Sequence, residues 1–269
     1  MTSPLLESEG AFPVVAALVR RERARAMIRA AFPRRRGRLV LARNAEDLNQ
    51  QLRGSLVDAV IVDVAGPTED TWRAIALAAE YPTAGFFALS PMRAGDATPT
   101  ADCAGREFAG VIVEGVDDAV VREIVLRAAF SVRFARALES PPPALGLRSD
   151  LQVAAWRMVV AHAGRPVRTA GLASSLEVTR EHLSRSFAAH GSPNLKRVID
   201  LVRLIAAAEL AKNPGLDLRD VATVLGFASA SHLSTTAQRI AGTKPVSLTR
   251  LRTTDIVDRF VRGHGRSRA

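Results

Sequence analysis

Cysteine is almost absent from this 269-residue chain, which contains Cys103 alone. A single cysteine excludes an intrachain disulfide bond and a thiolate metal cluster. The five histidines do not have the spacing of metal ligands, and no nucleophile, base and metal set converges in the sequence. We therefore expect no enzyme activity, no metal and no cofactor. Cys103 could in principle accept an alkyl group, as in DNA-repair regulators, but a lone cysteine is far more often incidental.

Long apolar runs are also missing. No run approaches the roughly 20 residues needed to span a bilayer. The N-terminus does not show the basic-then-apolar order of a signal peptide. We expect a protein with no membrane contact, located in the cytoplasm with the nucleoid, and long enough for two cores of ordinary size.

Positive charge is concentrated in the second half of the chain. Residues 150–269 contain 18 Lys and Arg against 9 Asp and Glu, whereas residues 1–149 contain 19 against 18. Nearly all of the net charge of +10 thus belongs to the second half. Binding to the phosphates of nucleic acid needs such an excess.

The same half carries one helix-turn-helix pattern written twice, within residues 167–251. His-Leu-Ser occurs at residues 182–184 and again at 232–234, a separation of 50 residues (232 − 182). In each copy a short helical stretch precedes a turn, and a second helical stretch begins after Thr179 or Ser229. Hydroxyl residues at these positions accept hydrogen bonds from the free amides of the helix that follows. The pattern predicts two reading helices, because helix-turn-helix proteins place the second helix in the major groove.

A long helix expected over residues 193–211 joins the two copies. Its apolar residues have helical spacing, and Asn213-Pro214-Gly215 ends it. A rigid connector can hold two reading helices about 34 Å apart, one turn of the duplex, so that both enter the same face of double-stranded DNA.

This pattern resembles the DNA-binding domain of the AraC/XylS family of bacterial transcription regulators, over roughly the last 115 residues. Residues 203–210 resemble the family's connecting helix, residues 221–231 its second turn, and residues 242–245 its closing Gly-x-x-Pro. The resemblance implies base contacts from positions 181, 184 and 185 and from positions 231, 234 and 235. Burial of Leu183 and Phe187 would also turn residue 180 outward. The DNA-binding candidates are Arg180, Glu181, Ser184, Arg185, Ala230, Ser231, Ser234 and Thr235.

The second copy departs from the family pattern. Thr235 stands where the family usually has an arginine, and Ala237 where it has an aromatic anchor. Arginine can bind a guanine edge with two hydrogen bonds, worth about 1–3 kcal/mol of discrimination, and threonine cannot. The first reading helix is therefore expected to carry more of the sequence specificity.

The first half alternates apolar runs with helical patterns. The expected strands cover residues 12–19, 37–42, 57–64, 85–89 and 110–113, and the expected helices cover residues 21–31, 45–53, 71–80, 101–108 and 117–139. Five such units predict a flavodoxin-like α/β domain with a five-stranded parallel sheet, followed by an all-α domain with two helix-turn-helix motifs. The expected boundaries are 1–139 for the α/β domain, 140–149 for a Pro-rich linker, 150–252 for the DNA-binding domain and 253–269 for a basic tail, of which residues 259–269 are expected to be mobile.

At the carboxyl ends of the strands the α/β domain resembles a response-regulator receiver that has lost its chemistry. Asp63 stands where the phosphoacceptor aspartate would be, and Ser90 where the switch hydroxyl would be. Arg20 and Arg21 replace the acidic pair, however, and Glu114 lies near the expected lysine. A receiver holds Mg²⁺ with its carboxylates, and arginine cannot ligate a cation. Either arginine could pair with Asp63 and mimic the charge of the metal, locking one state; alternatively, Asp63 only caps or hydrogen-bonds a loop.

These patterns together predict a sequence-specific transcription regulator. The degenerate receiver would mediate homodimer formation or regulatory contacts, with RNA polymerase as a further partner. The apolar face of the helix expected over residues 117–139 could supply a dimer seam, although core packing would also account for it. Two alternatives stay open: a response regulator phosphorylated at Asp63, and an architectural DNA-binding protein with little sequence specificity.

Overall fold

The structure is a computed structural model that describes residues 12–35, 37–188 and 192–266. It forms two compact units. The α/β unit comprises Phe12–Arg133 with the short segment Asn213–Leu216, and the helical unit comprises Phe134–Lys212 and Asp217–Ala269. Each unit is described by itself below.

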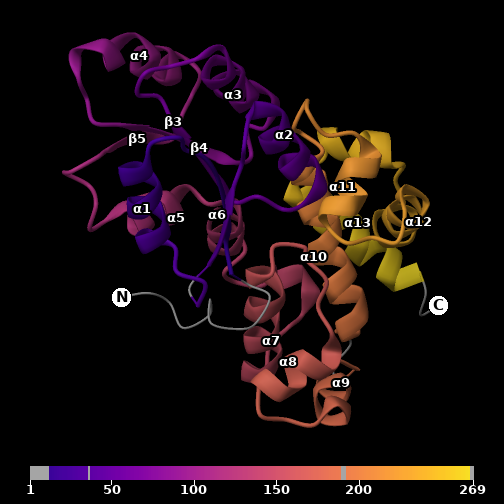
Figure 1. Ribbon diagram of the computed structural model, residues 1–269. Helices are drawn as coiled ribbons and strands as arrows, with labels where there is room; N and C mark the ends of the chain where they lie inside the picture. Colours follow the sequence, from indigo (N-terminus) through magenta and orange to yellow (C-terminus); the bar gives the residue numbers. More distant parts are fainter. Residues whose placement is uncertain (1–11, 36, 189–191, 267–269) are drawn as a thin grey trace. The chain divides into compact units, whose positions relative to one another are not determined.

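The α/β unit is built on a five-stranded, all-parallel sheet with the order β2-β1-β3-β4-β5 (Figure 1). The central strands are buried along their whole length and are apolar except for Asp63 and Ser90 at their carboxyl ends, as expected for parallel strands covered on both faces. Their carboxyl ends meet at one edge of the sheet, where the chain of β1 leads to Arg20 and β3 ends at Asp63. The strands are β1 (Val14–Leu18), β2 (Arg38–Leu41), β3 (Ala59–Asp63), β4 (Gly85–Ser90) and β5 (Gly110–Val113).

Helices cover both faces of this sheet. One apolar cluster joins the sheet to α1 (Glu22–Ala31) and α5 (Val121–Ala128). The other joins the opposite face to α2 (Ala45–Gly54), α3 (Glu69–Glu80) and α4 (Ala97–Gly105). This arrangement confirms the flavodoxin-like fold predicted from the alternating pattern, although α4 begins four residues before the expected helix.

The prediction of a single long helix over residues 117–139 is wrong. The structure has two helices there, α5 and α6 (Phe130–Ala137), separated at Ala129, whose backbone is extended with φ −59° and ψ 134°. The buried carboxylate of Asp58 causes the break, because its Oδ1 accepts a hydrogen bond from the amide of Ser131 at 2.8 Å. Its backbone carbonyl accepts a second from the amide of Phe130 at 3.0 Å. The boundary between the two units falls inside α6, earlier than the expected position after residue 139.

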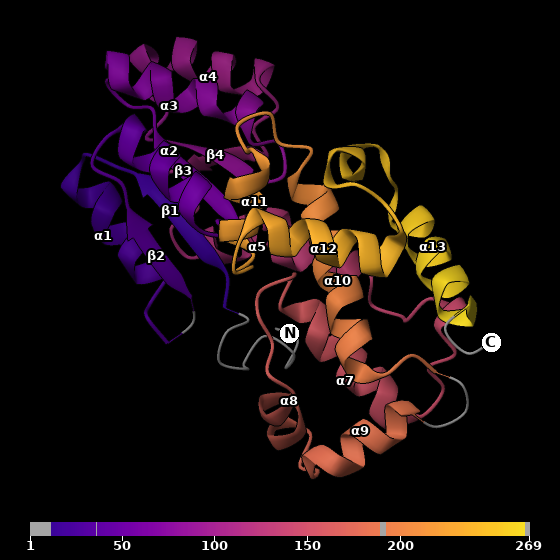
Figure 2. The ribbon, with the colours of Figure 1, turned by 90° about the vertical axis from the view of Figure 1, so that its right-hand side faces the viewer.

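The helical unit is packed around one central helix, α10 (Leu195–Leu210), which has 16 residues and is largely buried. Figures 1 and 2 both place α8 and α9 beside one end of α10 and α11 and α12 beside the other. The elements are η3 (Pro143–Leu145), α7 (Asp150–Ala161), α8 (Thr169–Ser175), α9 (Arg180–Ala188), α10 (Leu195–Leu210), α11 (Leu218–Val224), α12 (Ala230–Ala241), η5 (Pro245–Arg250) and α13 (Thr253–Arg266).

The expected linker and tail both differ from the structure. Residues 140–149 belong to the helical unit, where Leu145 and Leu147 are buried and the carbonyl of Gly146 accepts a hydrogen bond from Ser192 at 2.9 Å. The segment expected to be a basic tail, mobile from residue 259, forms α13 as far as residue 266, because its apolar residues pack into the core: Ile256 and Phe260 are fully buried. The rest of that tail, residues 267–269, lies outside the described residues.

Candidate functional site

The first helix-turn-helix consists of α8 and α9. The Oγ1 atom of Thr179 accepts a hydrogen bond from the amide of His182 at 3.1 Å, as the sequence predicts for a helix cap. Leu183 and Phe187 are fully buried and fix the inner face of α9. The outer face is exposed and carries all four candidates that the sequence places there, Arg180, Glu181, Ser184 and Arg185. Among the described residues, neither arginine forms an ion pair, so both guanidinium groups are available to a ligand.

The second helix-turn-helix consists of α11 and α12 and repeats this construction. The Oγ atom of Ser229 accepts a hydrogen bond from the amide of His232 at 3.1 Å. Leu233 and Ala237 are buried and face the core of the unit. The outward candidates differ in exposure: Ser231 and Thr235 are exposed, whereas Ala230 and Ser234 are half-buried.

The hydroxyl groups of α12 already have partners inside the helix. Ser234 donates to the carbonyl of Ala230 at 2.9 Å, and Thr235 donates to the carbonyl of Ser231 at 3.0 Å. A hydroxyl bonded to the helix one turn back keeps its acceptor lone pairs but has used its only proton. The outer face of α12 can therefore offer fewer hydrogen-bond donors to a base edge than α9 offers through Arg180 and Arg185.

Arg203, on α10, joins the connecting helix to the second turn. Its Nη2 atom donates to the carbonyls of Leu225 at 3.0 Å and Gly226 at 3.2 Å, and its guanidinium lies 4.0 Å from the ring centroid of Phe227. Burial lowers the pKa of Arg203 from its ordinary value, and the charge of Asp200 partly opposes this effect. The side chain thus satisfies carbonyls left free at the end of α11 and fixes the turn that precedes α12. The sequence pattern places Arg203 on the connecting helix but does not reveal this role.

We expect Arg203→Met to destabilise the helical unit by about 1–3 kcal/mol, because two carbonyls lose a charged donor and the ring loses a cation. Methionine keeps the apolar stem of the side chain. Arg219→Met, at an exposed position of α11, is the control and should cost less than about 0.5 kcal/mol. Urea unfolding of both variants measures the difference, and equal stabilities would show that Arg203 does not hold the turn.

The carboxyl edge of the α/β sheet brings Arg21, Asp63 and Glu114 together. Arg21 donates to Asp63 from Nε at 3.1 Å and from Nη2 at 2.8 Å, and its Nη1 bonds to Glu114. The two carboxylate side chains are only 2% and 5% exposed, and Arg23 adds a second ion pair to Glu114 at 3.1 Å. Burial alone would lower the pKa of Arg21, but the hydrogen bonds and charges of both carboxylates outweigh it and raise that pKa. The guanidinium is therefore permanently charged.

This arrangement does not fit the Mg²⁺ that a receiver requires. Asp63 and Glu114 both turn their carboxylates to Arg21, whose guanidinium partly balances their negative charge. No group of three or more potential metal ligands occurs in the part of the chain that the structure describes. Asp63 also accepts a hydrogen bond from the amide of Ala65 at 3.3 Å. It therefore also hydrogen-bonds the loop that follows β3, which was the alternative interpretation of its sequence position.

The other two predicted receiver residues make separate contacts. Arg20 pairs with Asp70 at 2.8 Å and bonds to Thr68, at the start of α3. Ser90 is buried and donates to Asp96 at 2.8 Å, while its Oγ accepts from the amide of Met92 at 2.8 Å. The hydroxyl is thus held within its own loop by a buried aspartate that the sequence reading did not single out.

Cys103 is a buried core residue rather than a reactive one. Its side chain is fully buried in the cluster beneath α4. Burial, with a smaller effect from Asp102, raises the pKa of the Cys103 thiol to about 12. A neutral, inaccessible thiol is a poor nucleophile, which argues against an alkyl-accepting role.

Comparisons with known proteins identify the helical unit. Residues 172–250 match the family model described as Helix-turn-helix domain. This region is similar to an AraC-type helix-turn-helix domain, which supports DNA binding by the helical unit. No curated protein matches the chain.

Among solved structures, a full-length FixJ from B. japonicum is similar at 11% identity and a TM-score of 0.38, covering 84% of this chain and 96% of that one. The flavodoxin-like fold of the α/β unit is defined by its own strand order and helix positions. Within the described residues, no helix has both the length and the apolar character to cross a membrane.

Proposed function

We propose that this protein is a sequence-specific transcription regulator that reads two segments of the major groove with α9 and α12. One observation carries the proposal: both helices begin at a capping hydroxyl, bury their inner face and leave their N-terminal outer face uncovered. That is the face through which helix-turn-helix proteins contact base edges. The 16 residues of α10 span about 24 Å and connect the two motifs as one rigid element.

The two helices differ in what they offer DNA. The first presents two exposed arginines, whereas the second presents small and hydroxyl side chains, and the hydroxyl protons of Ser234 and Thr235 are bonded within the helix. We assign most of the base discrimination to α9 and mainly positioning contacts to α12.

The α/β unit acts in this proposal as a receiver-like module without phosphoryl chemistry. Arg21 keeps the charge at the carboxyl edge in one state, and the module serves homodimer formation or regulatory contacts, including contact with RNA polymerase. Exposed apolar side chains beside α5 support a protein contact there, since Val116 is 76% exposed and Val120 is 45% exposed.

Phosphorylation at Asp63 is the principal competing function, and the ion pair with Arg21 opposes it. We expect no labelling of Asp63 by a small-molecule phosphodonor such as acetyl phosphate in the presence of Mg²⁺, because the carboxylate is held by a guanidinium. Intact-protein mass spectrometry of the wild type and of Asp63→Asn provides the measurement. Robust labelling of the wild type that disappears in Asp63→Asn would establish a response regulator instead.

Selection of bound duplexes from a randomised library tests the DNA-reading proposal. A regulator that reads sequence should enrich one recurrent motif, with its most constrained bases in the segment that α9 contacts. An architectural binder would enrich no motif. Mapping the binding sites across the genome would then show their positions relative to promoters.

A further inference from the structure

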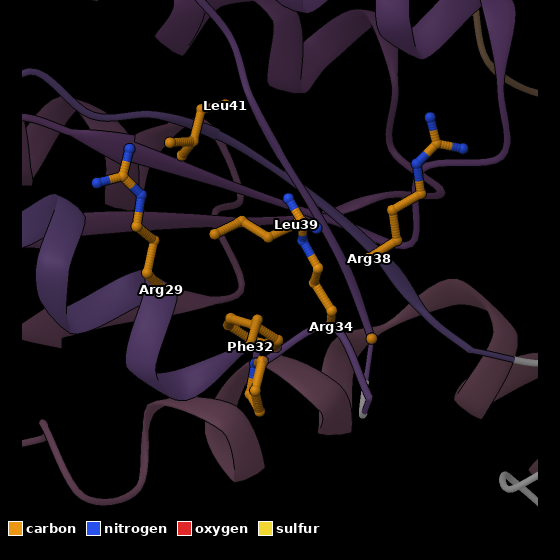
Figure 3. Close-up of a pocket in the computed structure, with 8 residues that line it drawn as sticks. Arg29, Phe32, Arg34, Arg38, Leu39 and Leu41 are labelled. Carbon is orange, nitrogen blue, oxygen red and sulfur yellow. The ribbon is translucent and has the colours of Figure 1, made fainter.

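A pocket lined by arginines lies at the free edge of the α/β sheet, away from the carboxyl edge that holds Arg21. It is formed by the end of α1, the following loop and β2 (Figure 3). Among the described strands β2 pairs with β1 alone, so the pocket opens beside the last strand of the sheet. Its volume of about 560 Å³ falls within the range of roughly 300–1,000 Å³ that is usual for small-molecule sites.

The floor of this pocket is hydrocarbon. Phe32, at the end of α1, is only 3% exposed and belongs to the core of the unit. Leu39 and Leu41 are half-buried and pack on the same core. Because side chains alternate along a strand, these two leucines share the face of β2 that is turned to Phe32 and α1. The floor can therefore hold an apolar group.

The rim is cationic. Arg29, Arg34 and Arg38 line the pocket, and none of the acidic residues that the structure describes does. Figure 3 shows the side chains of Arg29 and Arg34 on either side of Leu39. Among the described residues, Arg34 and Arg38 form no ion pair, and Arg29 has one only, with Glu22 at the long distance of 3.9 Å.

The sequence around this pocket also carries charges of one sign. Between Glu22 and Glu46 the chain has no acidic residue and eight arginines. Residues 1–149 as a whole are nearly neutral, with 19 basic against 18 acidic residues. The positive charge of residues 23–45 is therefore local in the sequence, and it favours an anion.

We infer that this pocket binds a small amphipathic anion, with a carboxylate or phosphate group held by Arg29 and Arg34 and an apolar body on Phe32, Leu39 and Leu41. Guanidinium groups bind either kind of anion through paired hydrogen bonds. The apolar floor distinguishes this site from a contact with DNA phosphates, which would need only the arginines.

Calorimetric titration of the full chain with butanoate, hexanoate and octanoate tests the inference. Octanoate should bind about 15-fold more tightly than hexanoate, because it has two more methylenes and each buried methylene contributes about fourfold. Octylammonium, which has the same chain and the opposite charge, should bind at least tenfold more weakly than octanoate. Inorganic phosphate, which has no apolar body, should also bind weakly.

Variants locate the site. Arg29→Gln/Arg34→Gln should weaken octanoate at least tenfold, whereas Arg35→Gln should change its affinity less than twofold. Arg35 is an exposed arginine of the same segment that does not line the pocket. Circular dichroism should show wild-type helix content in both variants.

Three results would overturn the inference: affinity independent of chain length, equal binding of octylammonium, or an equal loss in Arg35→Gln. A fourth is absence of saturable octanoate binding together with weaker binding of a random DNA duplex by the double variant. That outcome would show that Arg29 and Arg34 contact the phosphate backbone of DNA instead of a small anion.

Discussion

Replacing Arg21 by alanine should destabilise the α/β unit by about 3 kcal/mol, the lower end of the cost of removing one partner from a buried ion pair. Asp63 and Glu114 are 98% and 95% buried as side chains, and both pair with this guanidinium, although Glu114 would keep its ion pair with Arg23. Arg21 itself is 27% exposed, so water can partly replace it, and the full cost of an isolated buried charge will not be reached.

Amide hydrogen exchange in β1 and β3 measures this effect directly. A loss of about 3 kcal/mol corresponds to roughly 100-fold faster exchange of their most protected amides. Arg20→Ala is the matched control, because Arg20 is the neighbouring residue and its ion pair with Asp70 is 46% and 23% exposed. It should cost less than about 1 kcal/mol.

The Arg21 variant also tests whether this side chain takes the place of a metal. With the guanidinium gone, two adjacent carboxylates remain, and millimolar Mg²⁺ should slow exchange in Arg21→Ala while leaving the wild type unchanged. Equal stability of Arg21→Ala and Arg20→Ala would contradict the claim that Arg21 stabilises the carboxyl edge of the sheet by pairing with Asp63 and Glu114.

Arg185→Ala should reduce the preference for the selected DNA motif over a mutated motif by about 5- to 100-fold, which corresponds to about 1–3 kcal/mol. The guanidinium is exposed on the outer face of α9 and pairs with no carboxylate in the described residues. Thr235→Ala, at the equivalent position of α12, should change the preference less than twofold, because its hydroxyl proton is bonded to the carbonyl of Ser231.

Fluorescence anisotropy with matched and mutated duplexes at fixed salt separates the two substitutions. Both variants keep the buried face of their helix, so thermal unfolding should be close to that of the wild type. Similar losses of preference from Arg185→Ala and Thr235→Ala would mean that the two helices share the reading equally.

Much of the fold is predictable from the sequence because it depends on local patterns. Apolar runs of strand length gave β1 and β3 within two residues of their ends, and the hydroxyls Thr179 and Ser229 located the starts of α9 and α12. These features depend on burial periodicity and on helix caps, which neighbouring residues determine.

Other features depend on contacts between distant segments and could not be read in this way. The break between α5 and α6 contains neither glycine nor proline and is imposed by the carboxylate of Asp58, 73 residues earlier. The sequence offered Arg20 and Arg21 as equal partners for Asp63. The direction in which the chain leaves β1 decides that Arg21 pairs with Asp63 and that Arg20 pairs with Asp70.

Competition between the selected duplex and a scrambled duplex, across a series of salt concentrations, tests the central claim that this protein reads DNA sequence. The account predicts that the selected duplex binds at least 10³-fold more tightly at physiological salt, the lower limit typical of specific regulators. Both affinities should fall as salt increases, because phosphate contacts contribute to each. Equal affinities for the two duplexes throughout the series would contradict the account and leave an architectural DNA-binding protein.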